Sequence, residues 1–191
     1  RFRFATLISA RQQDDPVVTQ VPLTLDRSRG DKGVLIGHMD KANPHLDLLD
    51  GRRMLVLFHG PNAYISPKLS RTNVLPTWNS ITVRVNGNVS LVSDRATLVK
   101  NLCNLAEQCG HDDRLSADDP RIEKLLAYIV GFEIAIEQMI GRFKLSQDRS
   151  ESDRHSAAMA LVRKAEAGEL DIIELAVGLP LLEIDAATNP R

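Results

Sequence analysis

A long stretch of alternating apolar and polar residues in the middle of the chain constrains the fold more than any other feature. From Ile81 to Leu91 apolar residues occupy every second position, and Gly87 divides the stretch into two halves. Alternation at period two is typical of a β-strand with one buried face. The phase is the same on both sides of Gly87, so one strand bent at the glycine is favoured over a hairpin that turns at Asn86–Gly87.

Other segments extend this β pattern and add helices. Strand-like runs cover residues 2–8, 17–25, 33–39, 53–58 and 132–136. Helices are expected at residues 43–49, 93–109, 119–126 and 150–168, with Ser93 and Gly110 capping the second of them. In that helix, one apolar stripe is expected to contain Leu98, Leu102, Leu105 and Cys109. This order is not the alternating βαβ pattern of a doubly wound sheet, so we expect a mainly β (α+β) antiparallel barrel with peripheral helices.

The length of 191 residues fits one domain with a helical appendage. We expect residues 1–149 to form the barrel domain, with inserted helices at about 93–127, and residues 150–191 to form a C-terminal helical segment. The apolar residues of the last part, between 170 and 184, need a surface to bury against. The first residue is Arg1, and the sequence leaves open what precedes it.

Charge and cysteine usage bear on the partners and the compartment. The 24 Lys and Arg residues nearly balance the 25 Asp and Glu residues, so the net charge of −1 gives no general attraction to nucleic acid or anionic lipid. No apolar run is long enough for a transmembrane helix. Cys103 and Cys109 lie about 240° apart around the expected helix, and their spacing is not that of a zinc site. They are expected to be free thiols in a reducing cytoplasm.

Three polar segments flank the strongest strands: residues 37–45, 60–79 and 142–149. The Rossmann, P-loop, nucleophile-elbow and zinc-protease motifs do not occur in the chain. As loops at strand ends, the three segments would suit a phosphorylated planar ligand. Lys41 and Lys144 would supply charge, Thr77 and Ser146 hydroxyl groups, and Trp78 an apolar face for stacking.

The motifs in these segments carry a family resemblance. In order, they read GHMDKANPH, LFHGPNAYISP, VLPTWN and GRFKLSQDR. From about Phe4 to Leu161 the chain resembles the PaiB-type family of bacterial FMN-binding negative transcriptional regulators. The resemblance implies an FMN-binding split β-barrel, similar to that of pyridoxamine-phosphate oxidases. It also implies a cytoplasmic homodimer with the flavin at the subunit interface.

The matching motifs imply a set of cofactor-binding residues. The segment at Lys41 would lie near the flavin phosphate, with Lys41 as its charge partner. The full implied set is His38, Met39, Lys41, Asn43, Thr77, Trp78, Asn79, Lys144, Ser146 and Gln147.

The chain also departs from the family pattern. Leu69 and Ser70 stand where the family usually has an aromatic pair, Ser80 replaces a Tyr and Phe143 replaces a Trp. Asp148 replaces an Asn and adds a carboxylate beside the last motif. If these aromatic positions line the flavin pocket, the affinity for FMN is expected to be lower than in a typical member.

Three alternatives remain to be weighed. His38, His45 and His59 cluster around the first two motifs, but without the carboxylate or cysteine spacing of a metal site, and no metal is expected. The basic loop from Arg27 to Lys32 is the strongest candidate for DNA contact, although no helix-turn-helix accompanies it. A flavin-dependent oxidoreductase of the pyridoxamine-phosphate-oxidase-like class is the alternative function. We assign no catalytic residue, because in such enzymes the flavin carries the chemistry.

Overall fold

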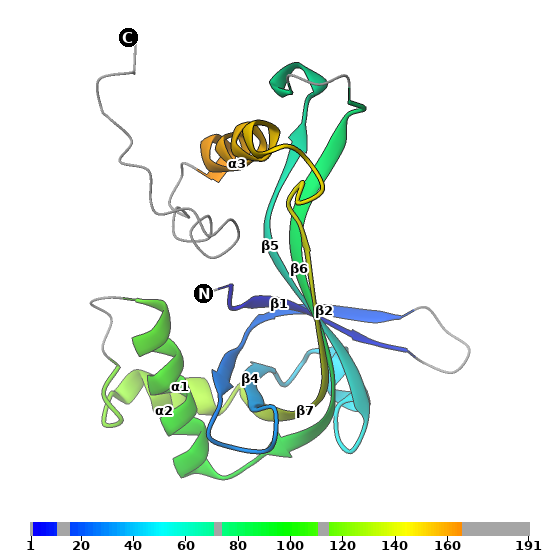
Figure 1. Cartoon of the computed structure of the whole chain (residues 1–191). Coiled ribbons are helices and arrows are strands. Elements are labelled where there is room, and N and C mark those ends of the chain that lie inside the picture. The colour runs from blue at the N-terminus through cyan, green and yellow to red at the C-terminus, as the bar shows by residue number, and fades with distance from the viewer. Residues whose placement is uncertain (1, 11–15, 71–73, 111–114, 166–191) are drawn as a thin grey trace. The chain divides into compact units, whose positions relative to one another are not determined.

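A computed structural model of the chain describes residues 2–10, 16–70, 74–110 and 115–165. The elements are β1 (Phe4–Ser9), β2 (Val17–Pro22), β3 (Thr24–Asp26), β4 (Val34–Asp40), η1 (Pro44–Leu48), β5 (Arg53–Ile65), η2 (Pro67–Leu69), β6 (Thr77–Val92), α1 (Arg95–Cys109), α2 (Pro120–Leu126), β7 (Ile129–Lys144) and α3 (Glu151–Ala165). Figure 1 shows their arrangement along the chain. The expected turn at residues 12–16 lies almost wholly outside the described residues, as does the apolar segment beyond residue 170.

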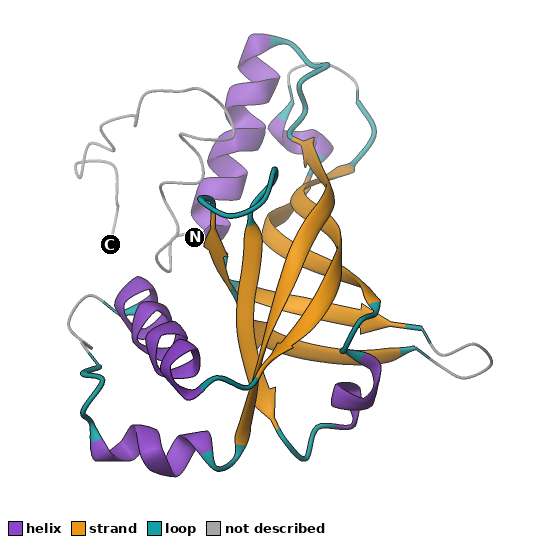
Figure 2. Ribbon diagram, turned by 90° about the horizontal axis from the view of Figure 1, so that it is seen from below, coloured by secondary structure: helices purple, strands orange, loops and turns teal. Residues whose placement is uncertain are grey.

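The strands form one seven-stranded sheet in the order β2-β1-β5-β6-β7-β4-β3. β2 and β3 stand at the two ends of this order, yet only Leu23 separates them in the chain. One bent segment therefore pairs with β1 through its first half and with β4 through its second half. The sheet closes into a barrel in this way, which confirms the expectation of a mainly β fold with peripheral helices (Figure 2).

The chain divides into two compact units, which we describe separately. The barrel unit contains residues 1–58 and 83–140, and the hairpin unit contains residues 59–82 with the described part of 141–191. The division passes through β5, β6 and β7, because each of these long strands belongs to both units in succession.

The core of the barrel unit consists of inward-facing residues from every strand and from η1. Leu7, Leu49, Val56, Phe132 and Ile134 have no exposed surface. In the strands these residues alternate with less buried neighbours, as the pleat of a β-strand requires. Gly87 lies inside β6, which is a single strand, so the bent-strand interpretation is correct and the hairpin is not. A Cβ atom at Gly87 would lie 2.3 Å from the carbonyl oxygen of Ala135, so the close approach of β6 and β7 requires glycine here.

The helices of the barrel unit begin at acidic caps. The N-cap of α1 is Asp94, not Ser93 as expected, since the Asp94 carboxylate accepts from the backbone N–H of Thr97 at 2.8 Å. Gly110 ends this helix as expected. The apolar stripe of α1 is shifted: Leu98, Val99 and Leu102 are buried, whereas Cys109 is exposed.

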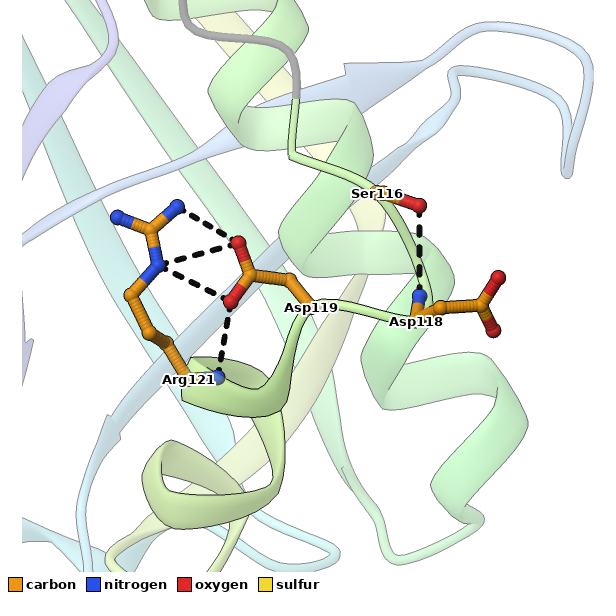
Figure 3. A network of polar contacts seen from close by, with 4 residues as sticks. All are labelled: Ser116, Asp118, Asp119 and Arg121. Carbon is orange, nitrogen blue, oxygen red and sulfur yellow. Dashed lines mark hydrogen bonds and ion pairs between the residues drawn. The ribbon is translucent and has the colours of Figure 1, made fainter.

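The expected start of α2 at Asp119–Pro120 is confirmed. The Asp119 carboxylate accepts from the backbone N–H of Arg121 at 2.8 Å, and the Arg121 guanidinium donates to both of its oxygens (Figure 3). These bonds lower the pKa of Asp119 to about 2. Ile122 then packs against Val99, Leu102 and Ile129 in a second apolar cluster.

The hairpin unit corrects two expectations about the polar segments. β5 continues through Gly60-Pro61-Asn62 to Ile65, β6 begins at Thr77 and β7 continues to Lys144, so residues 60–65, 77–79 and 142–144 are strand rather than loop. Aromatic and β-branched residues within these segments satisfy the strand pattern despite the turn-forming residues beside them. α3 buries Ala157, Ala158, Leu161 and Val162 and contacts η2.

Candidate functional site

The first group of implied cofactor residues lies at the end of β4 in the barrel unit. Met39 is buried in the barrel core, so its side chain is not available to a ligand. Alternation along the strand places His38 and Asp40 on the opposite face from Met39. Burial lowers the pKa of His38 below its ordinary value, so the imidazole is neutral at pH 7.

Lys41 is fixed by the carboxyl end of α2. Its Nζ donates to the carbonyl oxygens of Ala127 at 2.8 Å and Leu126 at 3.3 Å, and its backbone N–H donates to Tyr128 at 2.8 Å. These carbonyls are the unsatisfied acceptors of a helix end, which a cation stabilises. Because an ammonium group has three protons, one donor of Lys41 remains for an anion.

Asn43 caps η1 and belongs to a buried polar network that sequence reasoning did not find. Its side-chain oxygen accepts from the backbone N–H of His45 at 2.9 Å. His45 is fully buried: its Nδ1 lies 2.9 Å from Thr19 Oγ1 and its Nε2 lies 2.8 Å from Ser9 Oγ. The network joins η1 to β1 and β2. The one available signal was a histidine just after an Asn-Pro helix start.

The second group of implied residues lies in the hairpin unit, where β6 begins and β7 ends. Lys144 Nζ donates to Thr77 Oγ1 at 2.7 Å, and both side chains are at least partly exposed. Behind them, Ser146 Oγ donates to Asn79 Oδ1 at 3.1 Å, and both of these residues are buried. The structure therefore brings Thr77 together with Lys144, and Asn79 together with Ser146.

The turn after β7 is held by Gln147. Its Oε1 accepts from the backbone N–H of Leu145 at 2.8 Å, and its Nε2 donates to the carbonyl of Phe143. Gln147 thus closes the turn in which Ser146 adopts a φ of 61°. The side chain of Asp148 is exposed, 3.8 Å from the Arg149 guanidinium.

Trp78 presents an exposed aromatic surface whose orientation is fixed. Its indole N–H donates to Asn62 Oδ1 at 3.1 Å, and its ring lies 6.2 Å from that of Tyr64 at an angle of 60°. About half of each side chain is exposed, with values of 48% for Trp78 and 53% for Tyr64. Asn62 and Tyr64 were not among the implied cofactor-binding residues, although the motif LFHGPNAYISP, which contains them, carried part of the family resemblance. An exposed pair of this kind suits an apolar, planar group.

Two other features of the described residues bear on function. No cluster of three or more metal-ligating side chains occurs among them. None of the helices in this part of the chain is both long enough and apolar enough to cross a membrane.

Comparison with known families gives a match over most of the chain. Residues 1–138 match the family described as "Putative FMN-binding domain". The protease synthase and sporulation protein PAI 2 of Bacillus subtilis is 34% identical over 157 residues, which cover 78% of this chain and 74% of that protein. An uncharacterised protein of Emericella nidulans is 30% identical over 73% of this chain and 70% of its own length.

Solved structures share the fold at much lower identity. A flavocytochrome from Azotobacter vinelandii gives a TM-score of 0.58 at 16% identity, covering 80% of this chain and 67% of its own. A protein from Mycobacterium smegmatis that binds FAD and heme gives a TM-score of 0.56 at 17% identity. The match covers 81% of this chain and 72% of that protein. At such identities the likeness concerns the fold alone, and it agrees with the split-barrel expectation.

Proposed function

The chain belongs to the PaiB-type FMN-binding family, and from this premise we propose that it is a negative transcriptional regulator that responds to a ligand or a partner. The name of the Bacillus subtilis relative and the family resemblance of the motifs support the regulatory role. We place the protein in the bacterial cytoplasm, which agrees with two cysteines that form no disulfide.

FMN is the cofactor of this family, and the residues of the barrel unit suit its phosphate. When bound, FMN supplies a redox-active ring and a phosphate dianion. We propose that Lys41 binds the phosphate, with His38 and Asn43 beside it. The supporting observation is the fixed Lys41 ammonium, which is held by two backbone carbonyls and keeps one proton for an anion.

The hairpin unit offers a second set of contacts. Trp78, locked by Asn62, would pack against the apolar ring system, while Thr77 and Lys144 would donate to polar atoms. Asn79 and Ser146 would act behind this surface, since their side chains are buried against each other. Met39 would contribute through its backbone alone.

We also propose a homodimer, because the hairpin unit exposes a group of large apolar side chains. Leu75, Trp78, Tyr64 and Phe143 are 82%, 48%, 53% and 45% exposed. A second copy would remove part of this surface from water. Light scattering at micromolar concentration should then give twice the mass of the chain, and a monomer would contradict the dimer.

The test of the proposed function is a titration of the purified protein with FMN, followed by flavin absorbance and fluorescence. Lys41→Ala should weaken FMN binding by about tenfold or more, because one charge-assisted hydrogen bond to the phosphate is lost. Lys32→Ala, in the exposed loop before β4, is the matched control and should bind like the parent chain. Riboflavin, which lacks the phosphate, should bind Lys41→Ala and the parent chain equally.

Two results would contradict the proposal. Equal FMN affinity in Lys41→Ala and the parent chain would show that the phosphate lies elsewhere. Steady oxidation of a nicotinamide cofactor by the flavin-loaded protein would favour the alternative, a flavin-dependent oxidoreductase of the pyridoxamine-phosphate-oxidase-like class.

A further inference from the structure

The turn after β4, residues 41–46, keeps no backbone donor for an anion. Its N–H groups already donate to acceptors of the barrel unit, at distances of 2.7 to 3.0 Å, and they belong to Lys41, Ala42, Asn43, His45 and Leu46. The sixth residue, Pro44, has no N–H. A backbone group that is paired within the folded chain is not open to a ligand. A phosphate at this turn must therefore be bound by side chains.

Two side chains of the turn have donors to spare. Lys41 Nζ keeps one proton beyond its two bonds to carbonyl oxygens. Within the described part of the chain, Asn43 forms hydrogen bonds through its side-chain oxygen only, so both protons of its Nδ2 are free. Asn43 is half-buried, and in the same part of the chain the one buried and unpartnered side-chain nitrogen or oxygen belongs to Asn101. The Asn43 Nδ2 atom is therefore open to solvent.

The oxygen of the Asn43 amide is held from two sides. It accepts from the backbone N–H of His45 at 2.9 Å and from the Thr19 hydroxyl at 3.4 Å. A carbonyl oxygen has two lone pairs, so both are used. Turning the amide over would bring its NH₂ group against these two donors. The amide nitrogen of Asn43 therefore faces away from His45 and Thr19.

The Thr19 hydroxyl has one proton, and the buried His45 decides where that proton points. Thr19 Oγ1 lies 2.9 Å from His45 Nδ1, while His45 Nε2 lies 2.8 Å from Ser9 Oγ. Because Asn43 Oδ1 can only accept, Thr19 donates to it and must itself accept from a protonated Nδ1. Burial lowers the pKa of His45, so the imidazole is neutral at pH 7 and Nε2 accepts from Ser9. This arrangement satisfies all four side chains.

Two charges of opposite sign lie next to each other at the start of the turn. The exposed Asp40 carboxylate accepts from the backbone N–H of Ala42 at 2.7 Å, and Lys41 lies between these two residues in the chain. Asp40 therefore offsets part of the attraction that Lys41 has for a phosphate. A directed hydrogen bond from an uncharged amide counts for more here than at a purely basic site.

From these contacts we propose that Asn43 Nδ2 donates to the FMN phosphate, and that Ser9, His45 and Thr19 are positioning residues that hold the amide in this orientation. The inference rests on the flavin site proposed above. It extends that site from the surface of the turn to a chain of hydrogen bonds that joins η1 to β1 and β2 and does not touch the ligand.

Asn43→Asp tests the donor, because it keeps the oxygen that caps η1 and replaces the amide nitrogen with a carboxylate oxygen. The affinity for FMN should fall at least about thirtyfold, through loss of a charge-assisted hydrogen bond and repulsion of the phosphate. Riboflavin, which lacks the phosphate, should bind this variant and the parent chain equally. Asn104→Asp makes the same change of charge on α1, away from the flavin site, and should bind FMN within about twofold of the parent chain.

Thr19→Val tests the positioning role. The variant loses the hydroxyl that holds the amide, so its affinity for FMN should fall about three- to fivefold. Combined with Asn43→Asp, the same change should cause no further loss, because no donor is left to orient. Thr6→Val makes the matched substitution at a hydroxyl outside this network, on β1, and should bind FMN like the parent chain. Urea denaturation of each variant separates a loss of fold from a loss of binding.

Nitrogen NMR of the labelled, FMN-free chain adds a measurement that needs no ligand. His45 should show a protonated Nδ1 and an unprotonated Nε2 at pH 7. A proton on Nε2 instead would direct the Thr19 proton to His45 and away from Asn43, and would overturn the positioning role.

Two binding results would also overturn the proposal. One is equal FMN affinity in Asn43→Asp and Asn104→Asp, and the other is that Thr19→Val weakens FMN as much in the Asn43→Asp background as in the parent chain. If Lys41→Ala still lost FMN affinity in the same assay, the flavin site itself would stand. No FMN binding by the parent chain would instead remove the flavin site and this inference together.

Discussion

Ser146 combines two local features whose energies can be separated. It is the only described non-glycine residue with a positive φ, at 61°, and its buried hydroxyl donates to Asn79. The left-handed backbone costs a non-glycine residue about 1 kcal/mol, and a buried acceptor left unpaired costs about 1–3 kcal/mol. The turn is thus strained in its backbone and stabilised by its side chain.

Ser146→Ala should therefore lower the free energy of unfolding by about 2 kcal/mol, since it removes the hydroxyl and keeps the strain. Ser146→Gly removes both the hydroxyl and the backbone strain. Its free energy of unfolding should therefore be about 1 kcal/mol higher than that of Ser146→Ala. Urea denaturation of the three proteins measures the difference. If Ser146→Gly were no more stable than Ser146→Ala, the positive φ would not be a source of strain.

His45 should make the stability of the barrel depend on pH. Burial lowers the pKa of His45 below its ordinary value of about 6.5, so the folded state holds it neutral while the unfolded chain takes up a proton. The unfolded state then binds more protons as the pH falls through about 6.5, and the free energy of unfolding falls with it. The loss levels off below the lowered pKa.

The measurement is the urea midpoint between pH 5 and 8. His45→Gln keeps a polar side chain in the network but cannot be protonated, so its stability should change less over this range than that of the parent chain. Some dependence should remain, because burial also lowers the pKa of His38. An identical pH profile in the variant would assign the whole effect to other groups.

At the scale of elements, the crossing of β6 and β7 depends on Gly87. A methyl group there would meet the backbone carbonyl of Ala135 at 2.3 Å, and a backbone atom cannot move aside as a side chain can. We expect Gly87→Ala to lower the free energy of unfolding by about 3 kcal/mol, the upper end for overpacking.

Ser90→Ala is the matched control. It also introduces alanine in β6, three residues further along and at an exposed position, and should change the free energy of unfolding by less than about 0.5 kcal/mol. Thermal and urea unfolding measure both variants. If Gly87→Ala were as stable as Ser90→Ala, β6 and β7 could move apart at Gly87 without loss of stability. The close approach of the two strands would then not be the reason for glycine at this position.

The elements show how far the sequence could predict this fold and where it failed. The alternation from Ile81 to Leu91 predicted the long strand, because Val83, Val85 and Val89 in its middle pack in the barrel core. The continuation of β5 through Gly60-Pro61 could not be predicted, since glycine and proline usually end strands and only the neighbouring strands favour this one. The helix cap is Asp94 and not the neighbouring Ser93. The sequence could not decide between them, because aspartate and serine are equally good N-caps.

The candidate site shows the same limit at the level of side chains. The motifs contain both Asn79 and Ser146, but their spacing in the sequence could not show that the two side chains are buried and hydrogen-bonded to each other. The groove of about 1060 Å³ that α1 lines together with residues of β3, β4 and β7 was also beyond prediction. Asn101, Asn104 and Gln108 look like an ordinary solvated helix face, and only the tertiary structure places strands opposite them.

For the whole molecule, the distribution of charge sets the expectation for DNA. The chain has a net charge of −1, and the strongest basic segment, Arg27 to Lys32, is partly neutralised. Arg29 is paired with Glu133 at 2.6 Å, in a contact where the carboxylate is only 13% exposed. A protein that binds DNA specifically usually neutralises about six to ten phosphates. The barrel unit does not offer that many basic groups in this loop.

We therefore expect regulation through a ligand or partner rather than sequence-selective DNA binding by this chain alone. A mobility-shift assay, with the FMN-loaded protein and the region upstream of its own gene, should give no more retention than a scrambled duplex at about 150 mM salt. A selective complex that weakened by about a thousandfold between 50 and 200 mM salt would contradict this expectation. Loss of that complex in Arg27→Ala combined with Lys32→Ala would then assign the contact to the loop, because both cations act by charge and neither packs in the core.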